Sequence, residues 1–236
     1  QMIFQDPYES LNPRFRVSDI VSEGPRALRL WGEREIEEQV AAMLAGVGLP
    51  AEKYWDRYPH ELSGGERQRV GIASALVMKP ELVVADEPLS MLDVSIRAGI
   101  LDLLKELSRQ RNFACIYVSH DLSILGNIAD RLLIMYLGQA VEVGSVHDVI
   151  KNPKHPYTRA LISAVPVPDP RVKRSPPKIV GEISRPVDPP PGCRFASRCP
   201  HADQSCSEVF IKLDTNSPLA HQAACHRLEQ INSEAT

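Results

Sequence analysis

Two short segments carry residues whose types and spacing could hydrolyse a nucleotide. In Ser63-Gly64-Gly65-Glu66, at the predicted start of a helix, two glycines would let backbone N–H groups and the helix dipole approach an anion. The run from Leu82 to Glu87 is apolar and ends in two carboxylates, Asp86 and Glu87. Asp86 could reach Mg²⁺ through water, and Glu87 could act as the general base on an attacking water. Taken singly, each segment has a simpler interpretation, as a helix cap or as an acidic turn after a strand.

The flanking pattern predicts the elements that must position these residues, and the fold class is α/β. Apolar residues recur at helical spacing in three segments: Glu33 to Val47, the stretch that begins at Ser63, and Ile96 to Leu107. Leu82–Ala85 and Phe113–Val118 are short apolar runs, which predict strands buried on both faces. Strand, helix and strand in that order predict a parallel sheet with a right-handed crossover. Residues 132–136 and 140–143 predict a hairpin.

Five motifs together resemble the ABC ATPase family, in family order and at family spacing. The signature motif is similar to Leu62–Arg69, the Walker B motif to Val84–Pro88, the D-loop to Ser90–Asp93, the H-loop to Ser119–Asp121 and the Q-loop to Phe4–Pro7. The resemblance implies a partial RecA-like parallel sheet plus a helical signature subdomain at about residues 14–78. It predicts an N-terminally truncated ATPase domain over residues 1–150.

The resemblance also implies roles for individual residues and a set of partners. Glu87, His120 and Gln5 would be catalytic, and Asp86 and Gln5 would hold magnesium. The nucleotide-contacting residues would be Ser63, Gly64, Gly65, Glu66, Asp86 and Asp93. Family members act as head-to-tail dimers, so Ser63 to Glu66 would complete the ATP site of a second subunit, and the pair could be a homodimer or a heterodimer.

The chain departs from the family at its front. It contains no Gly-x-x-x-x-Gly-Lys-[Ser/Thr], the loop that cradles the phosphates. Either the chain is a fragment that starts near Gln5 or it is a degenerate subunit, and the intact Glu87 and His120 favour the fragment. We expect the 236-residue chain to hydrolyse negligible ATP alone.

The C-terminal part, residues 151–236, differs in composition. Thirteen of the 20 prolines lie there, which predicts an irregular appendage. The segment Asn152–Leu161 and the cysteine-rich end resemble ATP-binding subunits of peptide and nickel importers, in particular the dipeptide and oligopeptide members. The cysteines follow the pattern C-x5-C-x6-C-x18-C and are Cys193, Cys199, Cys206 and Cys225. Four thiolates suit a 4Fe–4S cluster or Zn²⁺.

The choice between the two metals stays open. The paired C-x2-C knuckles of typical zinc sites are missing, and Cys199-Pro200 is similar to iron–sulfur runs, which favours the cluster. His201, His221 and His226 keep zinc as an alternative.

Composition narrows the class of protein. A net charge of −3 gives no electrostatic case for nucleic acid, and no apolar run approaches the length of a spanning helix. The resemblance therefore implies a peripheral subunit at the cytoplasmic face of the membrane, with two permeases and, indirectly, an extracytoplasmic binding protein as partners. Its expected function is ATP-driven peptide import. The alternatives are a soluble non-transport ABC ATPase and a catalytically incomplete metal-binding subunit, and the transported substrate is not encoded here.

Overall fold

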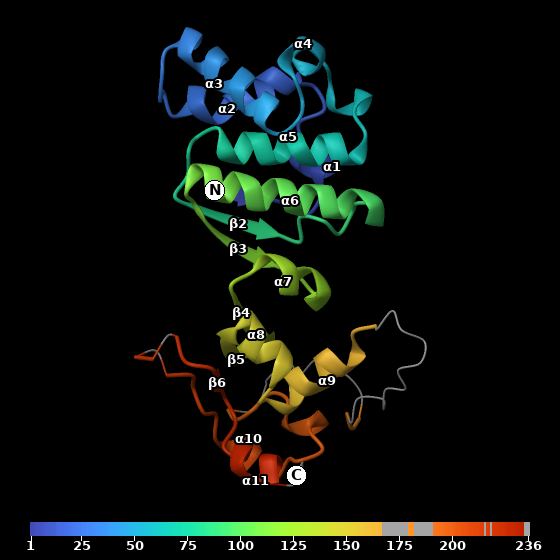
Figure 1. Ribbon diagram of the computed structural model, residues 1–236, viewed down its shortest axis with the longest axis vertical. Helices are drawn as coiled ribbons and strands as arrows, with labels where there is room; N and C mark the ends of the chain where they lie inside the picture. The colour runs from blue at the N-terminus through green and yellow to red at the C-terminus, as the bar shows by residue number, and fades with distance from the viewer. Residues whose placement is uncertain (167–178, 182–190, 215, 218, 234–236) are drawn as a thin grey trace. The chain divides into compact units, whose positions relative to one another are not determined.

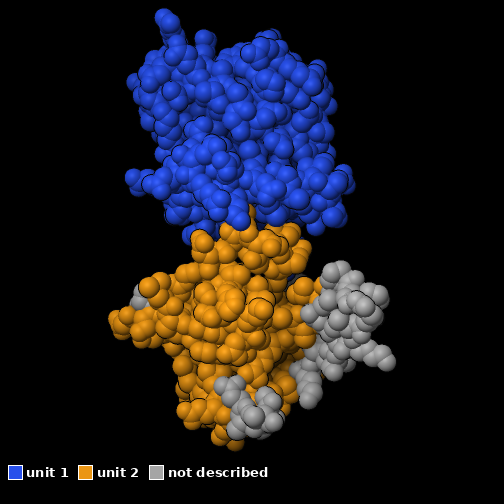
Figure 2. Space-filling view, viewed as in Figure 1, with its two compact units in different colours: residues 1–120 blue, residues 121–236 orange. Residues whose placement is uncertain are grey.

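A computed structural model describes residues 1–166, 179–181, 191–214, 216–217 and 219–233 (Figure 1). The chain forms two compact units, residues 1–120 and 121–236, which Figure 2 colours separately. Parts of the predicted C-terminal appendage, at residues 167–178 and 182–190, lie outside the described residues.

The first unit is built on a three-stranded parallel sheet in the order β1-β2-β3. Strand β1 (Met2–Ile3) pairs with β2 (Leu82–Asp86), and β2 pairs with β3 (Ala114–Val118). Helix α6 (Val94–Arg111) connects β2 to β3, as the strand–helix–strand order predicts. The carboxyl ends of β2 and β3 therefore meet at one edge of the sheet, where Asp86 pairs with Val118.

The prediction that both strands are buried on two faces is wrong. Val83 and Ala85 of β2 are fully buried, but Leu82 is 47% exposed. In β3, Ile116 and Val118 are 51% and 47% exposed. An apolar run shows only that each face tolerates burial, and among the described residues one face of this sheet is open.

Helices pack against the sheet and against one another to form the rest of the first unit. In Figure 1, α5 (Gly64–Leu76) and α6 run alongside each other on one side of the sheet. The remaining helices are α1 (Pro7–Ser10), α2 (Val17–Ala27), α3 (Glu33–Gly46), α4 (Ala51–Tyr54) and the short 3₁₀ turn η1 (Pro59–Glu61). The buried faces of α2, α3 and α5 form a common core that includes Val17, Val21, Val40, Leu44, Val70 and Leu76, each with no exposed surface. No helix among the described residues is long and apolar enough to span a bilayer.

The second unit contains an antiparallel sheet in the order β4-β5-β6. Strands β4 (Arg131–Tyr136) and β5 (Gln139–Ser145) form the predicted hairpin, with an irregularity between Ile134 and Met135. The C-terminal segment adds β6 (Gln222–Ala223) beside β5. The helical elements of this unit are α7 (Leu122–Ile128), α8 (Val146–Lys151), α9 (Pro156–Ala164), η2 (Ala196–Arg198), α10 (Ser205–Glu208) and α11 (Leu228–Ser233).

The tail and the hairpin share one hydrophobic core. Phe195, which is 1% exposed, packs with Tyr136 of β4 and with Tyr157 of α9, at ring-centroid distances of 5.2 and 5.4 Å. Leu132 and Val141 are buried in the same cluster. The hairpin therefore belongs to the same compact unit as the tail, whereas a functional boundary at residues 150/151 remains a prediction.

Candidate functional site

Three of the predicted catalytic residues converge at the edge of the parallel sheet. The Glu87 carboxylate has a separate partner on each oxygen: His120 Nδ1 lies 2.9 Å from Oε1, and Gln5 Nε2 donates to Oε2 at 3.2 Å. Gln5 follows β1, Glu87 follows β2 and His120 follows β3. Because these strands are parallel and adjacent, their following residues meet, although Gln5 is 82 residues from Glu87.

The backbone holds Glu87 in an uncommon conformation. Its φ is 41°, in the left-handed region that non-glycine residues seldom adopt. Its N–H donates to the Val118 carbonyl at 2.9 Å, and its own carbonyl accepts from both the N–H and the hydroxyl of Ser90. Such strain persists only when neighbouring contacts impose it, and it concentrates at functional sites.

The other two acidic residues of the predicted site lie close by in the chain but play different structural parts. Asp86 is the last residue of β2 and is half-buried. Asp93 is the exposed residue that precedes α6, and its side chain makes no capping hydrogen bond to that helix. The Asp93 carboxylate is therefore not committed to capping α6.

At the signature segment, Ser63 and Glu66 form a reciprocal cap on helix α5. The Ser63 hydroxyl accepts from the Glu66 N–H at 3.3 Å and donates to Glu66 Oε2 at 2.9 Å. The Ser63 N–H also donates to Glu66 Oε2, at 2.8 Å. The capping box fixes the first turn of α5, which carries Gly64 and Gly65.

Tyr54 is a contributor to this segment that sequence reasoning missed. Its hydroxyl donates to Glu66 Oε1 at 2.6 Å, and this bond, followed by the Ser63 N–H, lowers the pKa of Glu66. The Tyr54 side chain is 6% exposed and belongs to α4, which lies outside the motif. The only signal in the sequence is a tyrosine 12 residues upstream, and no periodicity links the two positions.

The four C-terminal cysteines gather around one pocket in the second unit. Cys193, Cys199, Cys206 and Cys225 all line it, and all are free thiols. Burial is the main cause that raises the pKa of each, for Cys199 to about 11, and neighbouring cysteines contribute to the shift of Cys193, Cys199 and Cys225. A cation in this pocket would relieve the cost of holding several thiolates together.

Side chains other than cysteine also offer ligand atoms here. Asp203, Cys206 and His226 place one ligand atom each within 4.8 Å of one another, and His226 Nε2 lies 3.8 Å from Cys206 Sγ. His201 lines the same pocket. By contrast, His221 Nε2 lies 2.7 Å from Glu142 Oε1, on strand β5. No pattern in the sequence singles out Asp203.

Two family models match the chain. The model described as "ABC transporter" matches residues 1–90, and the one described as "Oligopeptide/dipeptide transporter, C-terminal region" matches residues 141–206. The first range covers Gln5, the signature segment and Glu87, and the second covers three of the four clustered cysteines.

The names of curated relatives combine ATP binding with the transport of oligopeptides or dipeptides. The oligopeptide transport ATP-binding protein OppF of Escherichia coli is 44% identical over 98% of this chain and 69% of its own length. AppF of Bacillus subtilis, also an oligopeptide transport ATP-binding protein, is 46% identical over 96% of this chain and 69% of its own length. The dipeptide transport ATP-binding protein DppF of Haemophilus influenzae is 45% identical over 88% of this chain and 63% of its own length.

A solved structure supports the fold. The cbiO1 protein of Clostridium perfringens, part of the ABC transporter complex cbiONQ, is 30% identical with a TM-score of 0.58. The similarity covers 68% of this chain and 62% of that one. This similarity supports the α/β fold with its parallel sheet.

Proposed function

Because the chain belongs to the ABC transporter family of ATP-binding proteins, we propose that it couples ATP hydrolysis to peptide import across the cytoplasmic membrane. The observation that carries the proposal is the convergence of Gln5 and His120 on the two oxygens of Glu87. The C-terminal match at residues 141–206 and the names of the relatives support peptides as the cargo.

In this proposal, Glu87 is the general base and its two partners orient it. The carboxylate accepts the proton of the water that attacks the terminal phosphate of ATP. Gln5 and His120 fix the plane of the carboxylate, because each holds a different oxygen. His120 contacts Glu87 through Nδ1 and has a 76% exposed side chain, so its ring would be accessible to a phosphate oxygen.

The donor set at this edge fits magnesium. Asp86 supplies a carboxylate, and the hydrogen bond through Nε2 of Gln5 leaves its Oε1 as the ligand atom. Oxygen ligands of this kind are those that Mg²⁺ prefers, together with substrate phosphates and water. The ion would neutralise phosphate charge when nucleotide is bound.

The signature segment would serve the nucleotide of a second ATPase subunit. The N–H groups of Gly64 and Gly65 lie in the first turn of α5, where the helix dipole favours a phosphate. The Ser63 hydroxyl would exchange its bond to Glu66 for a phosphate oxygen. Asp93, in the D-loop-like segment, would communicate across the dimer interface.

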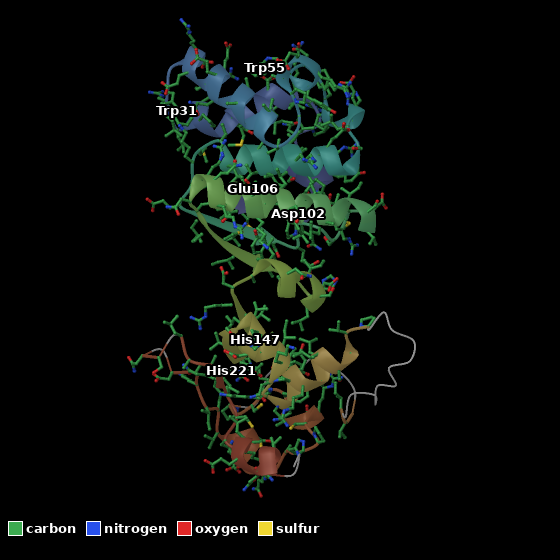
Figure 3. The ribbon with its side chains drawn as sticks, viewed as in Figure 1. Trp31, Trp55, Asp102, Glu106, His147 and His221 are labelled. Atoms are coloured by element: carbon green, nitrogen blue, oxygen red, sulfur yellow. The ribbon has the colours of Figure 1, made fainter. Side chains whose placement is uncertain are left out.

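The first experiment compares Glu87→Gln with Glu106→Gln in the complete transporter reconstituted in vesicles, in a chain that also carries the phosphate-binding loop which these 236 residues lack. Glu106 is exposed on α6 and hydrogen-bonded to Gln110, and Figure 3 labels it. We expect Glu87→Gln to lower ATP hydrolysis and peptide uptake by about 100-fold or more, with little change for Glu106→Gln. Wild-type turnover in Glu87→Gln would contradict the assignment of the base. ATP hydrolysis that never depends on the permeases would instead favour a soluble ATPase.

We also propose that Cys193, Cys199, Cys206 and Cys225 bind a metal centre, with a 4Fe–4S cluster as the preferred occupant. The support is that these four free thiols line one pocket, where Cys206 also lies within 4.8 Å of ligand atoms of Asp203 and His226. Four thiolates match the cluster's ligand set, and they also match zinc, for which Asp203 and His226 are further candidate ligands.

Anaerobic purification followed by iron, sulfide and zinc analysis separates the two metals. Brown protein with four irons per chain supports the cluster. Colourless protein with one zinc per chain supports the alternative. Chain that binds neither metal after reconstitution contradicts the metal site.

The proposed partners follow from the family. We propose a second ATPase subunit, two permeases and, indirectly, an extracytoplasmic substrate-binding protein, with the chain peripheral at the cytoplasmic face. The relatives are ATP-binding proteins of transporters, which supports permease partners. Co-purification of the permeases with the chain tests this part.

A further inference from the structure

Strand β5 carries two polar side chains that the proposed ATPase chemistry does not use. Gln139 and Glu142 lie on this strand, three residues apart. Each binds a segment that is far away in the chain and lies next to one of the four clustered cysteines.

Gln139 holds the backbone on both sides of Cys193. Its Nε2 donates to the Gly192 carbonyl at 3.1 Å, and its Oε1 accepts from the Arg194 N–H at 3.0 Å. A single amide thus bridges the residues before and after Cys193, across a separation of more than 50 residues. The Cys193 N–H in turn donates to the Cys206 carbonyl at 2.8 Å, so the same clamp reaches a second cysteine.

Glu142 is a fully buried carboxylate that binds the segment leading to Cys225. It has no exposed surface, and its Oε1 accepts from His221 Nε2 at 2.7 Å. Figure 3 shows His221 in the part of the second unit where β5 and β6 pair. Strand β6 begins at the next residue, and its pairing continues until the Ala224 N–H donates to the Val141 carbonyl at 2.8 Å. Cys225 follows directly.

The same carboxylate also anchors the segment that begins at Asn152. The N–H of Lys154 donates to Oε1 at 2.9 Å, and the N–H of His155 donates to Oε2 at 2.8 Å. The Lys154 ammonium donates to the His221 carbonyl at 2.6 Å, which ties this segment to the start of β6. His155 itself lines the cysteine pocket.

A glycine on β5 permits this close approach. A Cβ atom at Gly144 would lie 2.9 Å from Cδ2 of His221. The strand therefore has a side chain to bind His221 at Glu142 and no side chain to obstruct it at Gly144.

We infer that Gln139 and Glu142 are positioning residues for the cysteine site, Gln139 for Cys193 and Glu142 for Cys225. As a claim about metal binding, this inference rests on the proposed cysteine centre. As a claim about position, it stands on the hydrogen bonds of the metal-free chain. The inference also gives the Asn152–Leu161 segment a structural role, because Glu142 binds the N–H groups of Lys154 and His155 in this segment as well as His221.

The test measures alkylation of each cysteine by iodoacetamide in the metal-free 236-residue chain, followed by mass spectrometry. We expect Gln139→Ala to speed modification of Cys193 about tenfold relative to Cys115, with a smaller change at Cys225. Glu142→Gln should do the reverse, because its amide N–H₂ faces donors and releases the segment that leads to Cys225. The expected changes in modification rate follow from the loss of hydrogen bonds, because these bonds limit the local opening that exposes a cysteine to the reagent.

Two matched variants serve as controls. Gln204→Ala and Glu208→Gln make the same substitutions at exposed residues near Cys206, and neither should change modification of Cys193 or Cys225. A uniform rise at all five cysteines, or no rise at the assigned one, would overturn the inference.

Metal content gives the second readout. We expect each β5 variant to hold several-fold less metal than wild type at equal metal and protein concentrations, and the control variants to match wild type. If wild type takes up no metal, the cysteine centre is wrong and the alkylation pattern still decides the positioning claim. If the β5 variants load metal as well as wild type, the positioning claim fails although the cysteine centre stands.

Discussion

Tyr54→Phe removes one hydroxyl from beneath the signature segment and keeps the aromatic ring in place. The lost contact is the 2.6 Å hydrogen bond from Tyr54 to Glu66 Oε1. A hydrogen bond to a charged group contributes about 1.5–3 kcal/mol when it is well shielded. Glu66 is only partly buried, so solvent screening reduces the expected loss of unfolding free energy at pH 7 to about 1 kcal/mol.

The loss should depend on pH in a defined direction. The pKa of Glu66 is lowered in the folded chain, mainly by the Tyr54 hydroxyl and then by the Ser63 N–H. A depressed carboxyl pKa stabilises the fold above the unfolded pKa, and this stabilisation disappears as the pH falls through the folded pKa. The gap between wild type and Tyr54→Phe should therefore be constant near pH 7 and shrink below about pH 4.5.

Denaturant unfolding of the full chain at pH values from 7 down to 3.5 measures this gap. Tyr58→Phe is the control, because the Tyr58 hydroxyl accepts a long hydrogen bond, 3.5 Å, from the exposed Arg16 side chain, and we expect the substitution to cost less than about 0.5 kcal/mol. Equal stability of wild type and Tyr54→Phe at pH 7 would refute the reasoning, as would a gap that widens as the pH is lowered.

Two further predictions concern packing, and both are read from denaturant unfolding. Gly65→Ala should lower the free energy of unfolding by about 1–3 kcal/mol, because the added Cβ would lie 2.9 Å from Ile96 Cγ2. Gly71→Ala on the same helix adds a Cβ that meets nothing within 4 Å, and it should raise the free energy of unfolding by up to about 1 kcal/mol. Equal effects of the two substitutions would contradict this. Phe195→Ala should lower the free energy of unfolding by about 3–5 kcal/mol, because Phe195 is 1% exposed and lies in an aromatic cluster. Leu219→Ala, at an 84% exposed position, should change it by less than about 0.5 kcal/mol. A small effect of Phe195→Ala would show that the tail does not share the core of the hairpin.

The meeting of Gln5, Glu87 and His120 could be predicted from the sequence because each residue follows a strand. Gln5, Glu87 and His120 come after β1, β2 and β3, and adjacent parallel strands place their following residues together whatever their separation in the chain. The motif order alone thus specified the meeting point. It did not specify which atoms meet, because the two contacts with the Glu87 oxygens depend on side-chain rotamers.

The frame of the cysteine site could not be predicted in the same way. Strand β6 has two residues, too few to show a period of two, and its register on β5 appears only in three dimensions. Gln139 and Glu142 look like polar positions of an ordinary hairpin strand, yet Gln139 binds residues more than 50 positions away and Glu142 binds His221, 79 positions away. A cluster of cysteines in a sequence indicates a candidate metal site. The residues that we infer to position these cysteines show no pattern of spacing or composition that identifies them.

The arrangement around Glu87 also shows how a loop can present the proposed general base in a fixed orientation. The left-handed backbone at Glu87 is imposed by the Val118 carbonyl on one side and by Ser90 on the other. The carboxylate is then held at both oxygens by residues from two other strand ends. A base that is oriented before the substrate arrives avoids reorganisation during proton transfer. Gln5 and His120 therefore matter to the proposed reaction even before either contacts nucleotide, since removing one frees the carboxylate to rotate about the contact with the other.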